Sequence, residues 1–298
     1  MTPAVETSGL TKRYGRRVAL NDCSLSIPTG RVVGLVGPNG AGKTTLLHLA
    51  VGLLTPSAGT ISVLGHAPAE SPAQLGRVGF VAQDTPVYAG MSVADHLRFG
   101  EWVNPGWDSS LANDRIAQVG LDPAQRAGTL SGGQRAQLAL TLAIAKRPQL
   151  LVLDEPVAGL DPLARREFLQ ALMATVVEQG VSVVLSSHLV ADLERVCDYL
   201  VVLVASRVQV AGEIEQLLSE HHRLVAARRD GLQLPSGWKV IENRETDRQS
   251  TLVVRHDRPV VDPAWTIEEL DLEDVVLAYM ARASSNGAHR PTLVGVQR

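Results

Sequence analysis

Residues Gly37-Pro-Asn-Gly-Ala-Gly-Lys-Thr44 decide the fold of this 298-residue chain. They fit the pattern Gly-x-x-x-x-Gly-Lys-Ser/Thr, in which a glycine-rich turn directs successive backbone N–H groups at phosphate oxygens. The apolar run at residues 31–36 predicts a strand before this loop, and residues 44–50 predict a helix after it. Because the helix would begin at the loop, its N-terminus adds partial positive charge. The stretch therefore predicts a nucleotide-phosphate site, which we call the phosphate loop.

Each residue type in the phosphate loop has an expected role. Lys43 would reach the β- and γ-phosphates, and the Thr44 hydroxyl would bind Mg²⁺. A glycine-rich turn that binds nothing is the alternative, and the flanking strand and helix weigh against it. The other nucleotide ligands expected from this loop are Gly37, Asn39, Gly40, Ala41, Gly42 and Thr45.

A second apolar run, Leu150-Leu-Val-Leu-Asp-Glu-Pro156, ends in two adjacent acids. Successive side chains of a strand point to opposite faces, so Glu155 must lie where the strand ends and the chain turns at Pro156. We expect Asp154 to hold Mg²⁺ through its water shell, and Glu155 to orient and polarise the attacking water. The alternative is that Glu155 only caps the following turn.

Short apolar strands separated by helices continue along the N-terminal part of the chain. A further strand is predicted at residues 181–186, just before His188. Unbroken apolar strands that alternate with helices predict an α/β fold whose parallel sheet is covered on both faces. Residues 84–147 have a mainly helical pattern, with capping signals at Ser92 and Asp108, and we expect a helical subdomain there.

The C-terminal part has a different pattern. We expect a nucleotide-binding domain at residues 1–214, a small α+β accessory domain at 215–283 and a flexible tail at 284–298. The accessory domain has predicted strands at 238–243 and 251–255, a turn at 234–237 and a closing helix at 267–283. Metal binding is the weaker explanation for the acids at that helix start, where the helix dipole favours negative charge. These acids are Glu268, Glu269, Asp271, Glu273 and Asp274.

The amino-acid composition limits the classes of protein to which this chain can belong. The chain has 28 Lys and Arg against 31 Asp and Glu, and 45% hydrophobic residues. This balance excludes a disordered chain and a strongly basic nucleic-acid binder, so we expect no nucleic-acid partner. Cys23 and Cys197 show no spacing for a metal site or a disulfide framework, which predicts free thiols in a reducing compartment.

No segment has the pattern of a signal peptide or a membrane span. The N-terminal residues 1–17 have no apolar core. The most apolar stretch, residues 199–206, is much shorter than the roughly 18–20 residues that a bilayer requires. We therefore expect a cytoplasmic protein that would play any membrane role beside a separate membrane protein.

Over about residues 5–215 the chain resembles the nucleotide-binding subunit of ABC transporters. The family signature is matched by Leu130-Ser-Gly-Gly-Gln134 before a predicted helix. Ser131, Gly132 and Gly133 at a helix start form a second phosphate cradle, and one site does not need two. In this family two subunits pack head to tail, so that each signature closes over the γ-phosphate on its partner. The resemblance therefore implies an ATP-bound dimer, with residues 131–134, Gln134 included, as ligands of the partner's nucleotide.

The resemblance assigns further residues one by one. Tyr14 falls where the family stacks an aromatic ring on adenine, with a surface tyrosine as the alternative. Gln83 matches the glutamine that touches Mg²⁺ and the lytic water, and His188 matches the histidine that contacts the γ-phosphate. Asp161 matches a loop that crosses the dimer interface, and it also has the position of an N-cap before Pro162.

Bacterial ABC-2 type exporter ATPases resemble the chain most, and import subunits are a close second. The resemblance implies ATP hydrolysis with Mg²⁺, a homodimer or heterodimer, and a membrane-spanning permease on the inner face of the cell membrane. In the family, the helical subdomain receives a cytoplasmic helix of the permease, and Trp102 and Trp107 are either contacts there or buried core.

Two features limit the resemblance. Val157 replaces the commoner Thr, and Ala136 and Gln137 stand where polar and basic residues are usual, but neither change removes a group assigned to catalysis. The alternative function is a soluble ABC ATPase of DNA repair, translation or chromosome maintenance. Such proteins usually carry a coiled-coil insertion or two ATPase copies, and this sequence has neither.

Overall fold

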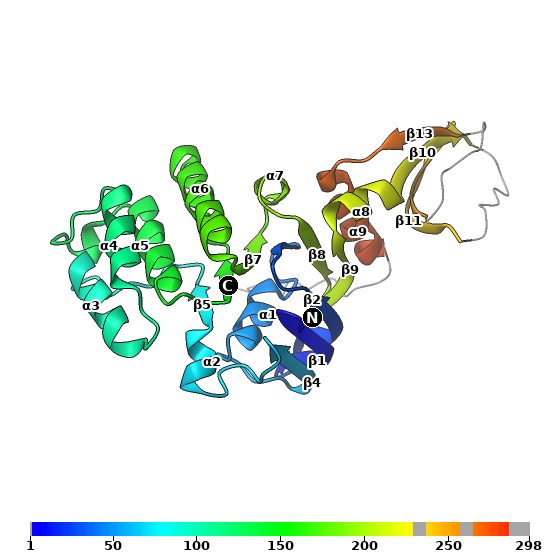
Figure 1. Ribbon diagram of the computed structural model, residues 1–298. Helices are drawn as coiled ribbons and strands as arrows, with labels where there is room; N and C mark the ends of the chain where they lie inside the picture. The colour runs from blue at the N-terminus through cyan, green and yellow to red at the C-terminus, as the bar shows by residue number, and fades with distance from the viewer. Residues whose placement is uncertain (1, 229–236, 257–264, 286–298) are drawn as a thin grey trace, which may run out of the picture. The chain divides into compact units, whose positions relative to one another are not determined.

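The computed structural model describes residues 2–228, 237–256 and 265–285, and it divides the chain into two compact units (Figure 1). The first unit is Met1–Glu213 and the second is Ile214–Arg298. Most of the turn expected at 234–237 and of the tail expected at 284–298 lies outside the described residues. Residues 284 and 285 are described, and they continue a helix rather than begin a flexible tail.

A six-stranded sheet forms the core of the first unit, with the strand order β5-β6-β7-β3-β8-β9. The first five strands are parallel, and β9 runs antiparallel to β8. β3, β6 and β7 are buried along their whole length, which is why their central residues are apolar. The α/β prediction is therefore confirmed. The strands are β3 (Val32–Val36), β5 (Val78–Val81), β6 (Leu150–Asp154), β7 (Ser182–Ser187), β8 (Tyr199–Val204) and β9 (Arg207–Glu213).

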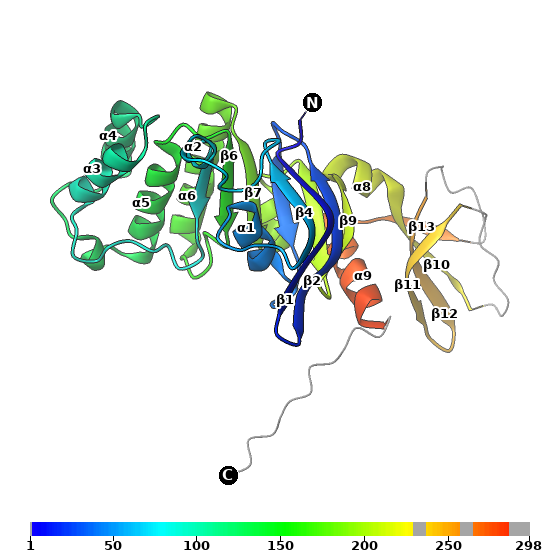
Figure 2. The same ribbon diagram turned by 90° about the horizontal axis from the view of Figure 1, so that it is seen from below.

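A separate three-stranded antiparallel sheet has the order β2-β1-β4 (Figure 2). Its strands are β1 (Val5–Tyr14), β2 (Arg17–Ile27) and β4 (Ala58–Val63). Leu10 and Leu20 of this sheet are fully buried in one apolar cluster with Leu35 of β3 and Leu47 of α1 (Lys43–Ala50). The shared core holds the β1–β2 hairpin beside the phosphate loop. The sequence analysis did not predict this sheet.

The regular elements between residues 84 and 147 are helical. Figure 1 shows α3, α4 and α5 together at one end of the first unit. Ser92 and Asp95 form a capping box on α3, and the Asp108 carboxylate accepts a hydrogen bond from the Leu111 N–H of α4. Trp107 packs against the apolar cluster of these helices, whereas Trp102 is 81% exposed. The helices are α3 (Val93–Val103), α4 (Ser109–Gln118), a 3₁₀ turn (Ala127–Thr129) and α5 (Gly132–Ile144).

Further helices complete the first unit, and the second unit holds a four-stranded antiparallel sheet of order β11-β12-β10-β13. The predicted strands near 238–243 and 251–255 are confirmed. The first unit adds α2 (Pro72–Gly76), α6 (Pro162–Gln179) and α7 (Val190–Glu194). The second contains α8 (Ile214–Glu220), β10 (His221–Ala227), β11 (Lys239–Glu245), β12 (Gln249–Arg255), β13 (Thr266–Glu269) and α9 (Leu272–Ser285).

The predicted start of the last helix, at residue 267, is wrong. Residues 266–269 pair with β10 as strand β13, so Glu268 and Glu269 do not lie on a helix. The Asp271 carboxylate accepts a hydrogen bond of 2.7 Å from the Asp274 N–H and caps α9, which begins at Leu272. Strand pairing, which depends on residues far away in the sequence, therefore decides the structure of a segment whose local acids also suit a helix start.

Two further expectations concern the thiols and the membrane. Cys23 and Cys197 are free cysteines, and burial raises the pKa of both thiols. Within residues 2–228, 237–256 and 265–285, no helix is long and apolar enough to cross a bilayer.

Helix α6 offers a matched pair of substitutions that tests the packing of the first unit. Phe168 is fully buried, and Val177 on the same helix is 81% exposed. Phe168→Ala should lower the free energy of unfolding by about 3–5 kcal/mol, because it removes apolar contacts and leaves a cavity. Val177→Ala should change it by less than about 0.5 kcal/mol. Urea unfolding followed by circular dichroism measures both, and equal effects of the two substitutions would contradict this packing.

Candidate active site

The candidate site lies at the carboxyl ends of four neighbouring strands, β5, β6, β7 and β3. Because these strands are parallel, the segments that follow them leave the sheet at the same edge. Gln83 follows β5, Glu155 follows β6, His188 follows β7 and the phosphate loop follows β3. Strand order therefore brings together residues that lie more than 100 positions apart in the sequence.

The phosphate loop has the backbone that its glycines permit. Gly40 and Gly42 have φ angles of 81° and 111°, which side chains other than hydrogen rarely allow. A Cβ on Gly42 would lie 2.4 Å from the Ala19 carbonyl oxygen, so the loop also passes too close to β2 for a larger residue. Gly42 is the N-cap of α1, and no described side chain caps this helix end. The first N–H groups of α1 are therefore open to an anion such as a nucleotide phosphate.

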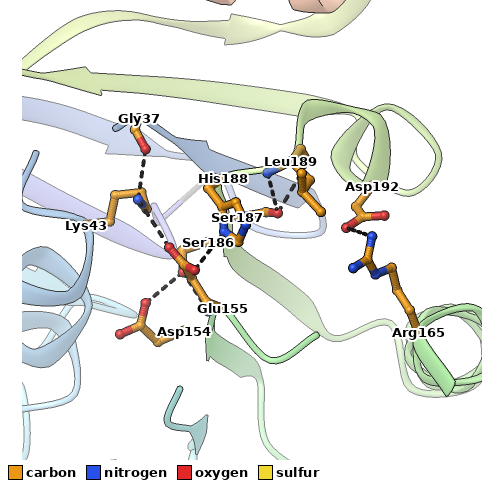
Figure 3. A network of polar contacts seen from close by, with 10 residues as sticks. All are labelled: Gly37, Lys43, Asp154, Glu155, Arg165, Ser186, Ser187, His188, Leu189 and Asp192. Carbon is orange, nitrogen blue, oxygen red and sulfur yellow. Dashed lines mark hydrogen bonds and ion pairs between the residues drawn. The ribbon is translucent and has the colours of Figure 1, made fainter. Parts of the chain in front are cut away.

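Lys43, Glu155 and His188 form one polar network (Figure 3). The Lys43 ammonium donates to the Gly37 carbonyl oxygen at 2.8 Å and lies 3.2 Å from Glu155 Oε1. The other oxygen of the same carboxylate, Oε2, lies 2.9 Å from His188 Nδ1. Lys43 and Glu155 are both buried. The two opposite charges balance each other inside the protein, where an unpaired charge would be strongly unfavourable.

Ser186 holds the two acids of β6 in place (Figure 3). Its hydroxyl donates to Asp154 Oδ1 at 2.7 Å and accepts a hydrogen bond of 2.8 Å from the Glu155 N–H. Glu155 has a φ of 45°, and this left-handed turn separates its side chain from that of the buried Asp154. The sequence analysis missed Ser186, because only the register of β6 against β7 places it opposite Asp154.

Most of the predicted site residues line a single cavity of about 520 Å³. Gly37 and Ala41 are in the loop but do not line the cavity. The sequence analysis missed Arg17, which lies at the start of β2 and lines this cavity. A basic residue close to Tyr14 in the sequence could have indicated a contact with the nucleotide. The predicted residues in the lining are Tyr14, Asn39, Gly40, Gly42, Lys43, Thr44, Thr45, Gln83, Glu155 and His188.

Thr44, Gln83 and Asp154, the three predicted Mg²⁺ ligands, also share one cavity. They line a neighbouring cavity of about 1110 Å³. A hydroxyl, an amide carbonyl and a carboxylate are the hard oxygen donors that Mg²⁺ takes from proteins. The donor set therefore fits Mg²⁺, and the rest of its coordination shell would come from water and phosphate.

The signature residues 131–134 lie away from the phosphate loop. Ser131 and Gln134 form a capping box at the start of α5, with hydrogen bonds of 3.2 Å and 2.9 Å. Ser131, Gly133 and Gln134 line a different cavity, of about 450 Å³, which α4, α5 and α6 enclose. Asp161 caps α6, as its position before Pro162 predicts. The phosphate loop and the signature residues of one chain therefore do not share a cavity.

Comparisons with known proteins agree with this geometry. Residues 20–158 match a family model described as ABC transporter. Nod factor export ATP-binding protein I of Mesorhizobium japonicum is 36% identical over 230 residues, which are 74% of this chain and 66% of that protein. The protein of the same name from Rhizobium johnstonii is 35% identical over 232 residues, 73% of this chain and 71% of that protein.

A solved structure shares the fold. The cbiO1 protein of Clostridium perfringens, described as part of the ABC transporter complex cbiONQ, superposes with a TM-score of 0.63 at 26% identity. The superposition covers 74% of this chain and 92% of that one. The resemblance read from the sequence is confirmed, and the chain belongs to the ATP-binding subunits of ABC transporters.

Proposed function

We propose that this ABC transporter ATPase dimerises head to tail around two ATP molecules and drives export through a separate membrane-spanning permease. The observation that carries the proposal is the position of Glu155, whose carboxylate lies between Lys43 and His188 beside the phosphate loop. The relatives named as export ATP-binding proteins favour export over import.

The Lys43–Glu155 contact gives the site a direct response to phosphate. Lys43 and the N–H groups at the start of α1 bind the β- and γ-phosphates. When Lys43 turns to a phosphate oxygen, Glu155 Oε1 loses its partner and becomes free to accept a hydrogen bond from the attacking water. His188 stays hydrogen-bonded to the other carboxylate oxygen, Oε2, so Glu155 retains its orientation. Glu155 then orients and polarises the water for attack on the γ-phosphate.

Mg²⁺ would be held by the oxygen donors of Thr44, Gln83 and Asp154, and it would offset the negative charge of the triphosphate. Ser186 prepares this arrangement, because its hydrogen bond fixes one oxygen of the Asp154 carboxylate. Gln83 also lies where the sheet leads into the helical part of the chain, between β5 and α3. It thereby links the metal site to the helices.

The separation of the two phosphate cradles supports a dimer. Ser131, Gly132, Gly133 and Gln134 act on nucleotide held by the partner subunit, since none of them lines the phosphate-loop cavity of their own chain and three of them, all but Gly132, line a different one. Tyr14, which is 46% exposed and lines the phosphate-loop cavity, stacks on adenine. The dimer forms between two copies of this chain or between this chain and a related one.

Exposed apolar side chains on and before α3 favour a protein partner there. Tyr88, Phe99 and Trp102 are 63%, 43% and 81% exposed. Large apolar and aromatic groups of this kind are typical of contact surfaces. They serve as the docking surface for the permease, which places the ATPase on the inner face of the cell membrane.

Glu155→Gln tests the proposed catalytic role. The amide keeps the size of the side chain but cannot polarise water as a carboxylate does, so turnover should fall by about 10²–10⁴-fold. ATP binding should persist, and an ATP-bound dimer should accumulate. Phosphate release and light scattering measure the two effects, with the exposed Glu6→Gln as the control. Wild-type turnover by the Glu155→Gln variant would rule out this role.

Ser186→Ala tests the positioning of the acids. It removes the hydroxyl between Asp154 and the Glu155 N–H, which leaves buried polar groups without a partner. We expect a loss of about 1–3 kcal/mol in stability. We also expect a higher Mg²⁺ concentration for half-maximal turnover, because Asp154 is no longer fixed. The exposed Ser8→Ala on β1 is the control. An unchanged Mg²⁺ requirement would contradict the positioning role.

A further inference from the structure

Arg115 on α4 carries a buried charge that forms no ion pair with the residues that the structure describes. The residue is 6% exposed. Its Nε and Nη2 atoms are buried without a hydrogen-bond partner, and its guanidinium forms no ion pair with any described residue. Burial lowers the pKa of Arg115, and the negative charge of Glu178 acts in the opposite direction. Buried cations are normally paired, so this one is suited to a ligand.

Arg115 lines the cavity of about 450 Å³ that also contains the signature residues. We call it the Arg115 cavity. Gln137 lines it too, is 8% exposed, and has an Oε1 atom with no hydrogen-bond partner among the described residues. An amide can rotate by 180° and present its N–H₂ group instead. Two buried polar side chains from different helices, α4 and α5, are thus both available to one ligand.

The start of α5 adds donors to the same cavity. The capping box uses the N–H groups of Ser131 and Gln134. The N–H groups of Gly132 and Gly133 stand at the first two helical positions, where no intrahelical acceptor is available. Gly133 lines the cavity, and the positive end of this 13-residue helix lies there with it. Glu167 is an acidic residue of the lining, and it forms no ion pair with Arg115.

We propose that the Arg115 cavity binds a phosphate group, with Arg115 as its charged ligand. A guanidinium matches a phosphate oxyanion through paired hydrogen bonds, and the Gly133 N–H and the Gln137 amide supply further donors. The phosphate is either that of a nucleotide on a second subunit or free orthophosphate. The first source rests on the proposed function, whereas the second does not.

The first arm of the test uses orthophosphate alone. The full chain carries Lys43→Ala, so that the phosphate loop contributes little, and it is compared with versions that also carry Arg115→Gln or the exposed Arg98→Gln. A ligand that binds the native state raises the midpoint of thermal unfolding. If free phosphate is the ligand, it should raise the midpoint more than NaCl of equal ionic strength in the parent and the Arg98→Gln control. Because phosphate also stabilises folded proteins without a specific site, Arg115→Gln should reduce that difference below its value in the parent and in the Arg98→Gln control.

The second arm uses ATP in the Glu155→Gln background, with dimerisation followed by light scattering. If a nucleotide phosphate is the ligand, Arg115→Gln should raise the ATP concentration for half-maximal dimerisation by at least about tenfold, the range for a lost charged hydrogen bond. Binding of a fluorescent ATP analogue to the monomer should stay unchanged. An effect in either arm supports the proposal and identifies the source, and no effect in both overturns it. If the parent itself does not dimerise, the proposed function fails and the orthophosphate arm decides alone.

Arg115→Met separates a ligand from a structural partner. Without phosphate, this variant should be at least as stable as the parent in urea, because it replaces an unpaired buried charge by an apolar side chain of similar length. A clear loss of stability would show that the guanidinium has a structural partner within the chain, and it would overturn the proposal.

Discussion

The Glu155 carboxylate, shared between the Lys43 ammonium and the His188 ring, is the interaction on which the site depends. It requires β6 to lie between β5 and β7, with β3 next in order, since only then do all three residues leave the same edge of the sheet. It also requires the left-handed turn at Glu155, which Ser186 stabilises from β7. The buried parallel sheet thus serves the chemistry by fixing where its strands end.

The two phosphate cradles differ in how their charges are balanced. In the phosphate loop, Lys43 has a counter-charge in Glu155, so the loop carries its own substitute for phosphate. In the Arg115 cavity, the guanidinium forms no ion pair with a described residue, and its Nε and Nη2 atoms have no hydrogen-bond partner. Under the proposed function, phosphate at the loop would replace Glu155 as the partner of Lys43, whereas phosphate in the Arg115 cavity would give the guanidinium a partner that it lacks.

The sequence predicts the structure well where short-range features decide it. The loop from Gly37 to Thr44 follows from glycine conformations, and the position of the two acids follows from the end of the apolar strand β6. The caps at Ser92 and Asp108 follow from short spacings. Prediction from the sequence fails where contacts between residues far apart in the chain determine the structure. Ser186 and the start of α9 depend on strand register, and the β2-β1-β4 sheet depends on pairing across more than 40 residues. Trp102 and Trp107 are both tryptophans near the end of α3, and only tertiary packing separates the exposed Trp102 from the half-buried Trp107.

The central claim is that the phosphate loop of one subunit works with the signature residues of another. Lys43→Ala disables the first cradle. Gly132→Asp places a negative charge in the second, at a position where a Cβ meets only ordinary contacts. Each variant alone should be nearly inactive, and a mixture of the two should regain ATPase activity, because the mixed dimer contains one site with both cradles intact. A mixture that forms dimers and binds ATP but regains no activity would contradict the claim.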